Sequence, residues 1–224
     1  MKLSSRAHDL YEAFSRPGCP VCRLTLDSVH HHLDSLIYEY VNKPATHGAV
    51  RAARGFCPAH AWHVQDAINA SALGIAVLYE GVIRHLLADM GTVEPGGGRR
   101  QISQAESALK PRGPCPACEH QARVEEHLLR NLLAHMGEAE FAAEFAGSAG
   151  LCLPHLRQML EQKGSAEHKA QALAIQQAIW STLQAQLAEF MRKHDYRFTA
   201  EGMGEEGSSP RRAIEALAGQ KGLR

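Results

Sequence analysis

Gly18-Cys19-Pro20-Val21-Cys22, followed by Gly55-Phe56-Cys57-Pro58-Ala59-His60, is the most informative pattern in the sequence of this 224-residue chain. It returns in the second half as Pro114-Cys115-Pro116-Ala117-Cys118 and Gly150-Leu151-Cys152-Leu153-Pro154-His155. All six cysteines of the chain lie in these four stretches. Two cysteine pairs, each followed at nearly the same distance by a Cys-x-x-His, indicate an internal duplication.

The duplication continues in the apolar residues that follow each cysteine pair. Leucine or isoleucine stands 11, 14 and 15 positions after the second cysteine in both halves, as Leu33, Leu36 and Ile37, then Leu129, Leu132 and Leu133. These spacings place the three residues on one face of a helix. Similar spacings recur along almost the whole chain and alternating strand-like runs are lacking, so the sequence predicts an all-α fold of two tandem helical repeats.

The expected elements follow from the same periodicity. We expect helices over residues 5–15, 20–40, 45–53, 58–70, 71–90, 116–136, 138–146, 154–163 and 166–194. The Gly- and Pro-rich stretch at 94–98 marks a boundary. The predicted organisation is a first repeat at 1–90, a linker at 91–114, a second repeat at 115–198, and a flexible tail at 199–224 with a short amphipathic helix at 211–217.

The cysteine motifs have the residue types and the spacing of metal ligands. Proline follows three of the cysteines directly and is favoured at the first position of a helix, so these cysteines are candidate N-caps. The unpaired N–H groups and the positive dipole end at a helix N-terminus stabilise a thiolate, which is the form that binds metal. A three-residue step brings the second ligand beside the first. We expect each half to close its own Cys3His site, one from Cys19, Cys22, Cys57 and His60, the other from Cys115, Cys118, Cys152 and His155.

Two kinds of metal centre fit this ligand set. Cys3His is a standard set for structural zinc, whereas most iron–sulfur clusters use four cysteines, so zinc is favoured. Cys-Pro dipeptides also occur in cluster-binding sequences, which keeps an iron–sulfur cluster as the alternative. A thioredoxin-like dithiol needs a βαβ context that the sequence lacks, and a disulfide scaffold is typical of secreted chains.

Composition and charge argue against several classes of protein. The 24 basic and 24 acidic residues leave no net charge, so no overall field attracts nucleic acid or an anionic membrane. The most apolar stretch, 72–90, is interrupted by Glu80, Arg84 and Asp89 and lacks the roughly 20 apolar residues that span a bilayer. The first residues form no apolar signal-peptide core, so we expect a cytoplasmic protein.

The motifs resemble those of an uncharacterised family of bacterial proteins, in which CPxC and GFCxxH signatures are paired and duplicated. The resemblance rests on residues 12–24, 35–42 and 54–62. In the second half Leu151 stands where the pattern has phenylalanine, and no candidate ligand is lost. The resemblance implies the same eight ligands and a bacterial, cytoplasmic setting, but it implies no reaction.

Three functional hypotheses follow. The first is a non-enzymatic helical module that binds a protein partner and is stabilised by two structural zinc ions, because four protein ligands leave no position open for catalysis. The second is an iron–sulfur protein with two clusters for electron transfer or redox sensing. The third is an enzyme that uses one site as a thiol or Lewis-acid centre. No Ser-His-Asp order, Walker loop or dinucleotide fingerprint points to a catalytic residue elsewhere in the sequence.

Overall fold

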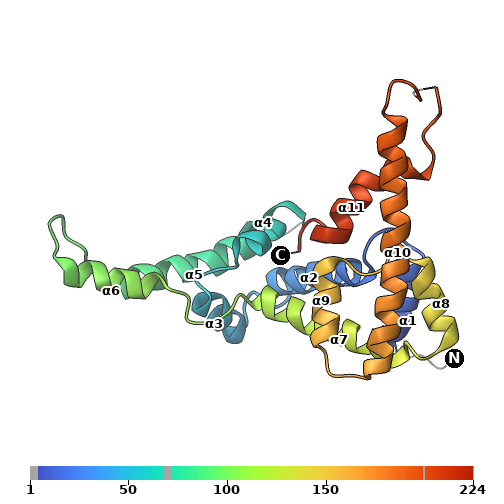
Figure 1. The fold of residues 1–224 in the computed structure, drawn as a ribbon. Helices are drawn as coiled ribbons and strands as arrows, with labels where there is room; N and C mark the ends of the chain where they lie inside the picture. The colour runs from blue at the N-terminus through green and yellow to red at the C-terminus, as the bar shows by residue number, and fades with distance from the viewer. Residues whose placement is uncertain (1–4, 68–71, 199, 224) are drawn as a thin grey trace. The chain divides into compact units, whose positions relative to one another are not determined.

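The computed structural model describes residues 5–67, 72–198 and 200–223. Within these ranges the chain forms eleven α-helices and one short 3₁₀ helix, with no β-strand, so the all-α prediction is confirmed. In chain order the elements are α1 (Ser5–Phe14), α2 (Pro20–Tyr38), α3 (Pro44–Ala52), α4 (Pro58–Ala67), α5 (Ala72–Met90), α6 (Arg99–Leu109), α7 (Pro116–His135), α8 (Ala139–Gly147), α9 (Leu153–Glu161), α10 (Ala166–Lys193), η1 (Glu205–Ser208) and α11 (Ser209–Ala218) (Figure 1).

Cysteines stand immediately before four of these helices. Proline is the first residue of α2, α4 and α7 and the second residue of α9. The carbonyl oxygens of Cys19, Cys57, Cys115 and Cys152 each accept a hydrogen bond from the N–H four residues later, at 2.8–3.2 Å. Each cysteine therefore closes the first turn of its helix from the N-cap position, as the prolines predict.

The sequence predicts a linker at 91–114, but the structure has a helix there, α6. Ala108 of α6 is buried, and α6 packs against α5. Arg54 fixes this arrangement, because it donates to the carbonyl oxygen of Ala108 and pairs with Asp89 of α5 at 2.8 Å. The few apolar residues of α6 and the three glycines before it explain why the sequence pattern indicates a loop.

The chain divides into two compact units that do not coincide with the two halves of the sequence. Unit 1 lies within residues 1–26 and 123–223, and unit 2 lies within residues 27–122. Unit 1 thus contains the first CPxC motif and the second Cys-x-x-His, and unit 2 contains the other two motifs. This division differs from the predicted repeats at 1–90 and 115–198.

The core of unit 1 is built from α1, α7, α8, α9 and α10. Phe14 of α1 packs against Phe141 and Phe145 of α8, with ring centroids 5.1 and 5.5 Å apart. Buried leucines of α7 and Met159 of α9 extend this cluster. Three cysteines, Cys19, Cys22 and Cys152, belong to the same buried cluster. The cysteine motifs of unit 1 are therefore part of its core.

The core of unit 2 joins α2, α3, α4 and α5. Its buried residues include Leu33 and Ile37 of α2 and Leu78 of α5. Gly74 lets α5 approach α2 closely, since a Cβ atom at this position would lie 2.7 Å from the carbonyl oxygen of Ile37. The cysteine motifs of unit 2 pack against this core, with Cys115 buried inside it.

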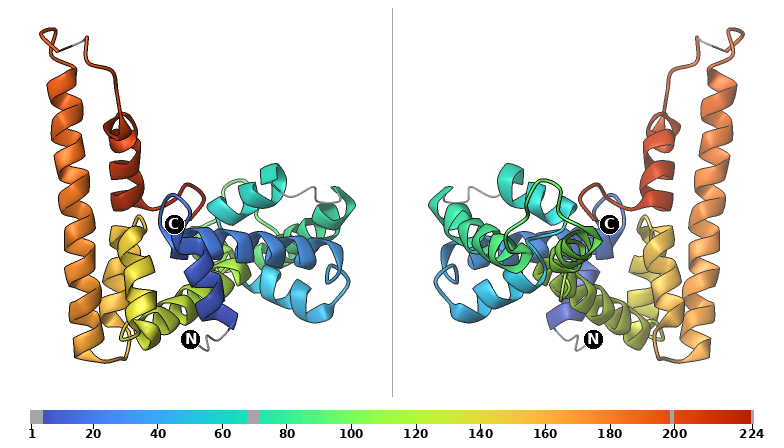
Figure 2. Two further views of the ribbon diagram at one scale, coloured as in Figure 1. Left: turned by 90° about the vertical axis from the view of Figure 1, so that its right-hand side faces the viewer. Right: turned by 90° about the vertical axis from the view of Figure 1, so that its left-hand side faces the viewer.

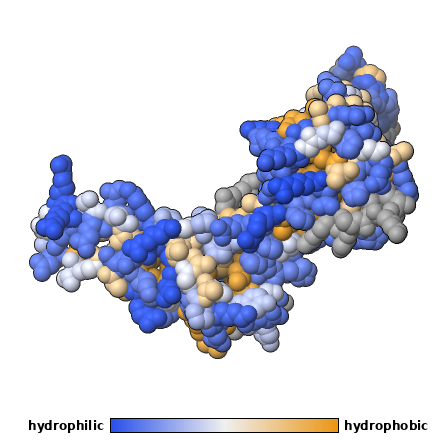
Figure 3. All heavy atoms as spheres, turned by 90° about the horizontal axis from the view of Figure 1, so that it is seen from below, coloured by the Kyte–Doolittle hydropathy of each residue, from blue (hydrophilic) through white to orange (hydrophobic). Residues whose placement is uncertain are grey.

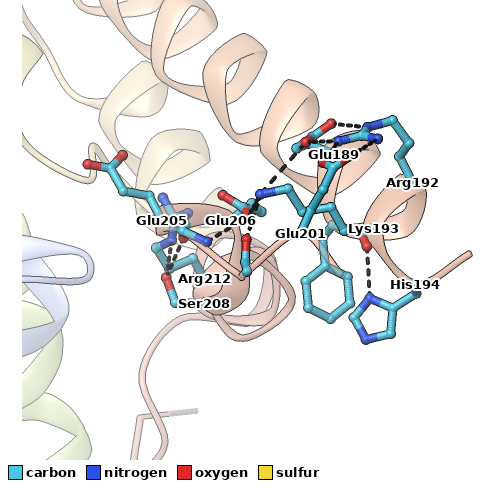
Figure 4. Close-up of polar contacts among 12 residues, drawn as sticks. Glu189, Arg192, Lys193, His194, Glu201, Glu205, Glu206, Ser208 and Arg212 are labelled. Carbon is cyan, nitrogen blue, oxygen red and sulfur yellow. Dashed lines mark hydrogen bonds and ion pairs between the residues drawn. The ribbon is translucent and has the colours of Figure 1, made fainter. Parts of the chain in front are cut away.

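Residues 200–223 lie in the predicted flexible tail, yet they form η1 and α11 and belong to unit 1. The amphipathic helix predicted at 211–217 is α11, which contacts α10 and α9 (Figures 1 and 2). Ion pairs hold the connection at the end of α10, where Lys193 pairs with Glu206 at 2.6 Å and Arg192 pairs with Glu189 and Glu201 (Figure 4). Residues 199 and 224 fall outside the described ranges.

The contact between Glu206 and Lys193 predicts an acid-sensitive attachment. The hydrogen bonds that Lys193 and the N–H of Gly204 donate lower the pKa of the Glu206 carboxyl to about 2. Since the pKa is lower in the folded state, the stabilisation is complete above the ordinary pKa of about 4.3 and is lost as the pH falls toward 2. We expect the NMR shift of the Gly204 amide to titrate with a midpoint near pH 2. The same amide should show no such step in Glu206→Gln; a midpoint above pH 4 in the unaltered protein would contradict the contact.

No helix within the described ranges is long and apolar enough to cross a bilayer. The face drawn in Figure 3 is largely hydrophilic, with hydrophobic side chains gathered in small groups.

Candidate metal centres

The eight predicted ligands gather into two groups of four. Cys19, Cys22, Cys152 and His155 form the group in unit 1, and Cys57, His60, Cys115 and Cys118 form the group in unit 2. Within each group the four sulfur and nitrogen atoms lie within 4.8 Å of one another. Each group therefore has the composition Cys3His and the four donor atoms of one tetrahedral centre.

The pairing of the motifs differs from the predicted one. The sequence predicts that Cys19 and Cys22 meet Cys57 and His60 of the same half. In the structure each CPxC meets the Cys-x-x-His of the other half, so that Cys19 and Cys22 meet His155 and its neighbour Cys152. Both pairings use the same residue types at the same spacing, and only the packing of the helices distinguishes them.

The donor atoms of unit 1 converge on the Nδ1 atom of His155. This nitrogen lies 3.5, 3.4 and 3.2 Å from the sulfurs of Cys19, Cys22 and Cys152. The sulfurs of Cys22 and Cys152 are 3.5 Å apart, well beyond the roughly 2.05 Å of a disulfide. Four ligands around a zinc ion, at bond lengths of 2.0–2.3 Å, lie about 3.5–3.8 Å from one another. The observed distances are close to the edges of such a tetrahedron.

The electrostatics of the unit 1 group favour a charged pair. Burial opposes ionisation of Cys19, but hydrogen bonds with Cys152, Cys22 and His155 outweigh it and hold the pKa of the Cys19 thiol well below its ordinary value. Burial also disfavours the charged form of His155, yet its bonds with Cys152, Cys19 and Glu125 raise the pKa of the imidazole to about 12. A metal ion would replace the protons in this group as the counter-charge of the thiolates.

Glu125 of α7 is a partner of the site that the sequence does not reveal. Its Oε1 lies 3.5 Å from Nε2 of His155, and its Oε2 accepts a hydrogen bond from Gln158 at 3.2 Å. In the sequence Glu125 is one of two adjacent glutamates, and no motif separates it from Glu126. A carboxylate behind a ligating histidine fixes the ring and the tautomer, so that Nδ1 faces the metal.

We expect Glu125→Gln to weaken metal binding at unit 1 by about 10- to 100-fold, because loss of such a carboxylate has this effect at other sites. Competition with a chromophoric chelator measures the affinity. Glu126→Gln is the matched control, since Glu126 pairs with Arg130 on the surface of the same helix. Equal affinities in the two variants would show that Glu125 plays no part in metal binding.

The unit 2 group has similar geometry and greater exposure. Nδ1 of His60 lies 3.2, 3.3 and 3.8 Å from the sulfurs of Cys57, Cys118 and Cys115. The sulfurs of Cys118 and Cys57 are 3.5 Å apart. His60 and Cys115 are buried, whereas Cys57 and Cys118 are half-buried; in unit 1 all four ligands are buried. The two groups therefore differ in their access to solvent.

The C-terminal segment accounts for part of the burial in unit 1. Gly219, which follows α11, has a φ of 81°, and a Cβ atom there would lie 3.3 Å from the sulfur of Cys22 and 3.5 Å from that of Cys152. Glycine allows both the left-handed conformation and the close approach of the backbone to the sulfurs. The segment after α11 thus covers the ligands of unit 1.

Residues 1–222 match a family of unknown function, DUF6062. The chain belongs to this family. It is also similar to the "Uncharacterized 23.9 kDa protein in xynA 3'region" of Caldicellulosiruptor sp. (strain Rt8B.4), with 23% identity over 189 residues that cover 84% of this chain and 88% of the relative. No solved structure matches the chain. The predicted resemblance to an uncharacterised family is confirmed, and it supplies no activity.

Proposed function

We propose that the chain binds two zinc ions, one in each unit, and that they stabilise a non-enzymatic helical module for protein binding. The observation that carries this proposal is the convergence of three sulfurs and one imidazole nitrogen, twice, within 4.8 Å. Each zinc ion would join the N-termini of two helices, α2 and α9 in unit 1 and α4 and α7 in unit 2. Binding of the ion then contributes directly to the free energy of folding.

The compactness of the groups favours zinc over an iron–sulfur cluster. A cubane cluster binds its four protein ligands through four different iron atoms, so the ligand atoms stand on the outside of a body of iron and sulfide. Ligand atoms only 3.2–3.8 Å from His155 Nδ1 or His60 Nδ1 fit around one ion instead. One histidine with three cysteines is also a standard set for structural zinc.

The ligand count supports a structural role. Four protein ligands complete a tetrahedral shell and leave no position for a substrate or an activated water molecule. In unit 1 the second ring nitrogen of His155 faces Glu125, and all four ligands are buried. These features are typical of a metal that holds helices together.

Exposed apolar side chains support a role in protein binding. In unit 2, Leu73, Ile83 and Leu87 of α5 are exposed by 72, 55 and 60%, and Ile102 of α6 is exposed by 60%. Leu73, Ile83 and Leu87 lie 10 and 4 residues apart, which places them along one side of α5. Exposed apolar side chains that share one side of a helix can form the contiguous patch that marks a protein interface, in contrast to apolar residues scattered singly.

Metal and sulfide analysis tests the proposal on protein purified without air and without a metal-affinity step. We expect two zinc ions per chain, no sulfide and no visible absorption. Iron and sulfide in amounts of about eight each, with absorption near 400 nm, would instead establish two cubane clusters and a redox function. Protein without any tightly bound metal would contradict both.

A further inference from the structure

Unit 1 contains a partly enclosed cavity of about 570 Å³ beside its metal ligands. One wall is α10, which contributes Ile175, Ile179 and Leu183, and the opposite wall is formed by α11. Residues 146–152, which are the end of α8 and its connection to α9, close one end. Cavities of roughly 300–1,000 Å³ with apolar walls and a few polar groups are the usual binding sites of small molecules.

The cavity is elongated. Its lining residues on α10 run from Ala174 to Gln186 at steps of three and four residues, which is one continuous side of the helix. Twelve residues of helix rise about 18 Å. α11 packs against α10, and Figure 2 shows it alongside the C-terminal half of that helix. The cavity therefore suits a long, narrow molecule better than a round one.

The two ends of the cavity differ in polarity. At one end the lining includes the small residues of 146–150, two metal ligands, Cys19 and Cys152, and Glu215, whose Oε2 lies close to Gly18. At the other end lie Thr182, Gln186 and Arg212. The walls between them are mainly alanine, isoleucine and leucine. A ligand that fits would have an apolar body and one polar head.

Arg212 gives the polar end a positive charge. Its Nη2 donates to Oε1 of Gln186 at 2.7 Å. The same Nη2 donates to the carbonyl oxygen of Glu205 at 3.1 Å, and its Nε donates to Oγ of Ser208 at 3.1 Å (Figure 4). The groups that accept hydrogen bonds from Arg212 among the described residues are an amide, a carbonyl and a hydroxyl oxygen, all of them neutral.

The carboxylates nearby have other partners. Glu215 lines the cavity but pairs with Arg211 at 2.9 Å. The carboxylate of Glu205 accepts from Gln186 at 3.5 Å, and Glu206 pairs with Lys193. No ion pair to Arg212 occurs among residues 200–223 or the rest of the described chain. Its charge, half-buried at one end of a largely apolar cavity, is thus suited to an anionic head.

We propose that this cavity binds an alkyl carboxylate, with the carboxylate at Arg212 and the chain directed toward Cys19 and Cys152. The proposal involves binding alone, without a chemical reaction, and it does not depend on which metal the two Cys3His groups bind. It adds a small-molecule ligand to the proposed protein-binding module.

Calorimetric titration of the metal-loaded full chain with decanoate, below the concentration at which decanoate forms micelles, tests this proposal. We expect saturable binding of one decanoate, with weaker binding of decanol and no binding of decylamine. Arg212→Gln should weaken decanoate binding by about tenfold or more, the effect of one charge-assisted contact, and leave decanol binding unchanged. Ala178→Phe should abolish the binding of both by filling the cavity.

Arg157→Gln is the matched control, because Arg157 is an exposed residue of α9 outside the cavity lining. It should bind decanoate as the unaltered chain does. Metal content is measured for every variant, which separates failure of this proposal from failure of metal binding. Absence of saturable binding to the metal-loaded chain, unchanged binding in Ala178→Phe, or equal binding of decylamine would each overturn the proposal.

Discussion

His155→Ala is expected to remove one metal ion per chain and to unfold unit 1. The side chain is buried among Cys19, Cys22 and Cys152, and its Nδ1 is the atom on which the three sulfurs converge. Without it the site has only three of its four ligands, and loss of the metal ion leaves the buried thiolates without a counter-charge. Loss of a structural metal or of a buried charged network is among the largest effects of a single substitution, on the order of 4 kcal/mol or more.

Hydrogen exchange followed by mass spectrometry measures the loss of structure separately for each unit. Protection should fall in α8, α9 and α10 and remain in α3, α4 and α5, which belong to unit 2. His127→Ala is the matched control, because His127 is exposed on α7 and should be replaceable without effect. A His155→Ala protein that keeps two metal ions and full protection in α9 would refute the assignment of this ligand.

Gly150→Val is expected to reduce the stability of unit 1 by a comparable amount, although it alters no metal ligand. Gly150 has a φ of 69°, and a Cβ atom there would lie 2.7 Å from Oε1 of Gln176. That oxygen accepts the N–H of Leu151 at 2.7 Å, and this hydrogen bond places the residue before Cys152. A β-branched residue adds backbone strain of about 1–3 kcal/mol to the steric conflict. We expect a clearly lower melting temperature and weaker metal binding at unit 1.

Gly147→Ala provides the comparison for this variant. Gly147 ends α8 three residues earlier, and a Cβ atom there would have no neighbour within 4 Å. The melting temperature of Gly147→Ala should equal or slightly exceed that of the unaltered protein, because alanine favours helix. If the melting temperature of Gly150→Val were also unchanged, the loop before Cys152 could not have the conformation and contacts given above.

Most of the helices could be predicted from the sequence because their signals are local. Proline after a cysteine marks the start of α2, α4 and α7, and the three- and four-residue apolar spacing marks their length. The ends of α2 and α10 agree with the predicted ends within two residues. The helix α6 was not predicted, because contacts with α5 and Arg54 stabilise it and its own apolar pattern is weak.

The residues of the candidate sites could be predicted, but their partners could not. Closing a site within one half requires a loop of about 35 residues, and the entropy of loop closure favours the shorter loop only slightly. The packing of Phe14 on Phe141 and Phe145 instead places the start of α2 in the same unit as α9. The role of Glu125 could not be predicted for the same reason, because only the packing of α7 against α9 brings its carboxylate to His155.

Metal content of two double variants tests the pairing of the motifs most directly. One variant combines Cys19→Ser with Cys152→Ser, and the other combines Cys19→Ser with Cys57→Ser; both are dialysed against a chelator of moderate affinity. The structure predicts that the first pair damages only unit 1 and leaves one metal ion per chain, whereas the second pair damages both units and leaves none. The opposite result, one ion with Cys19 and Cys57 replaced and none with Cys19 and Cys152 replaced, would show that each half of the sequence closes its own site.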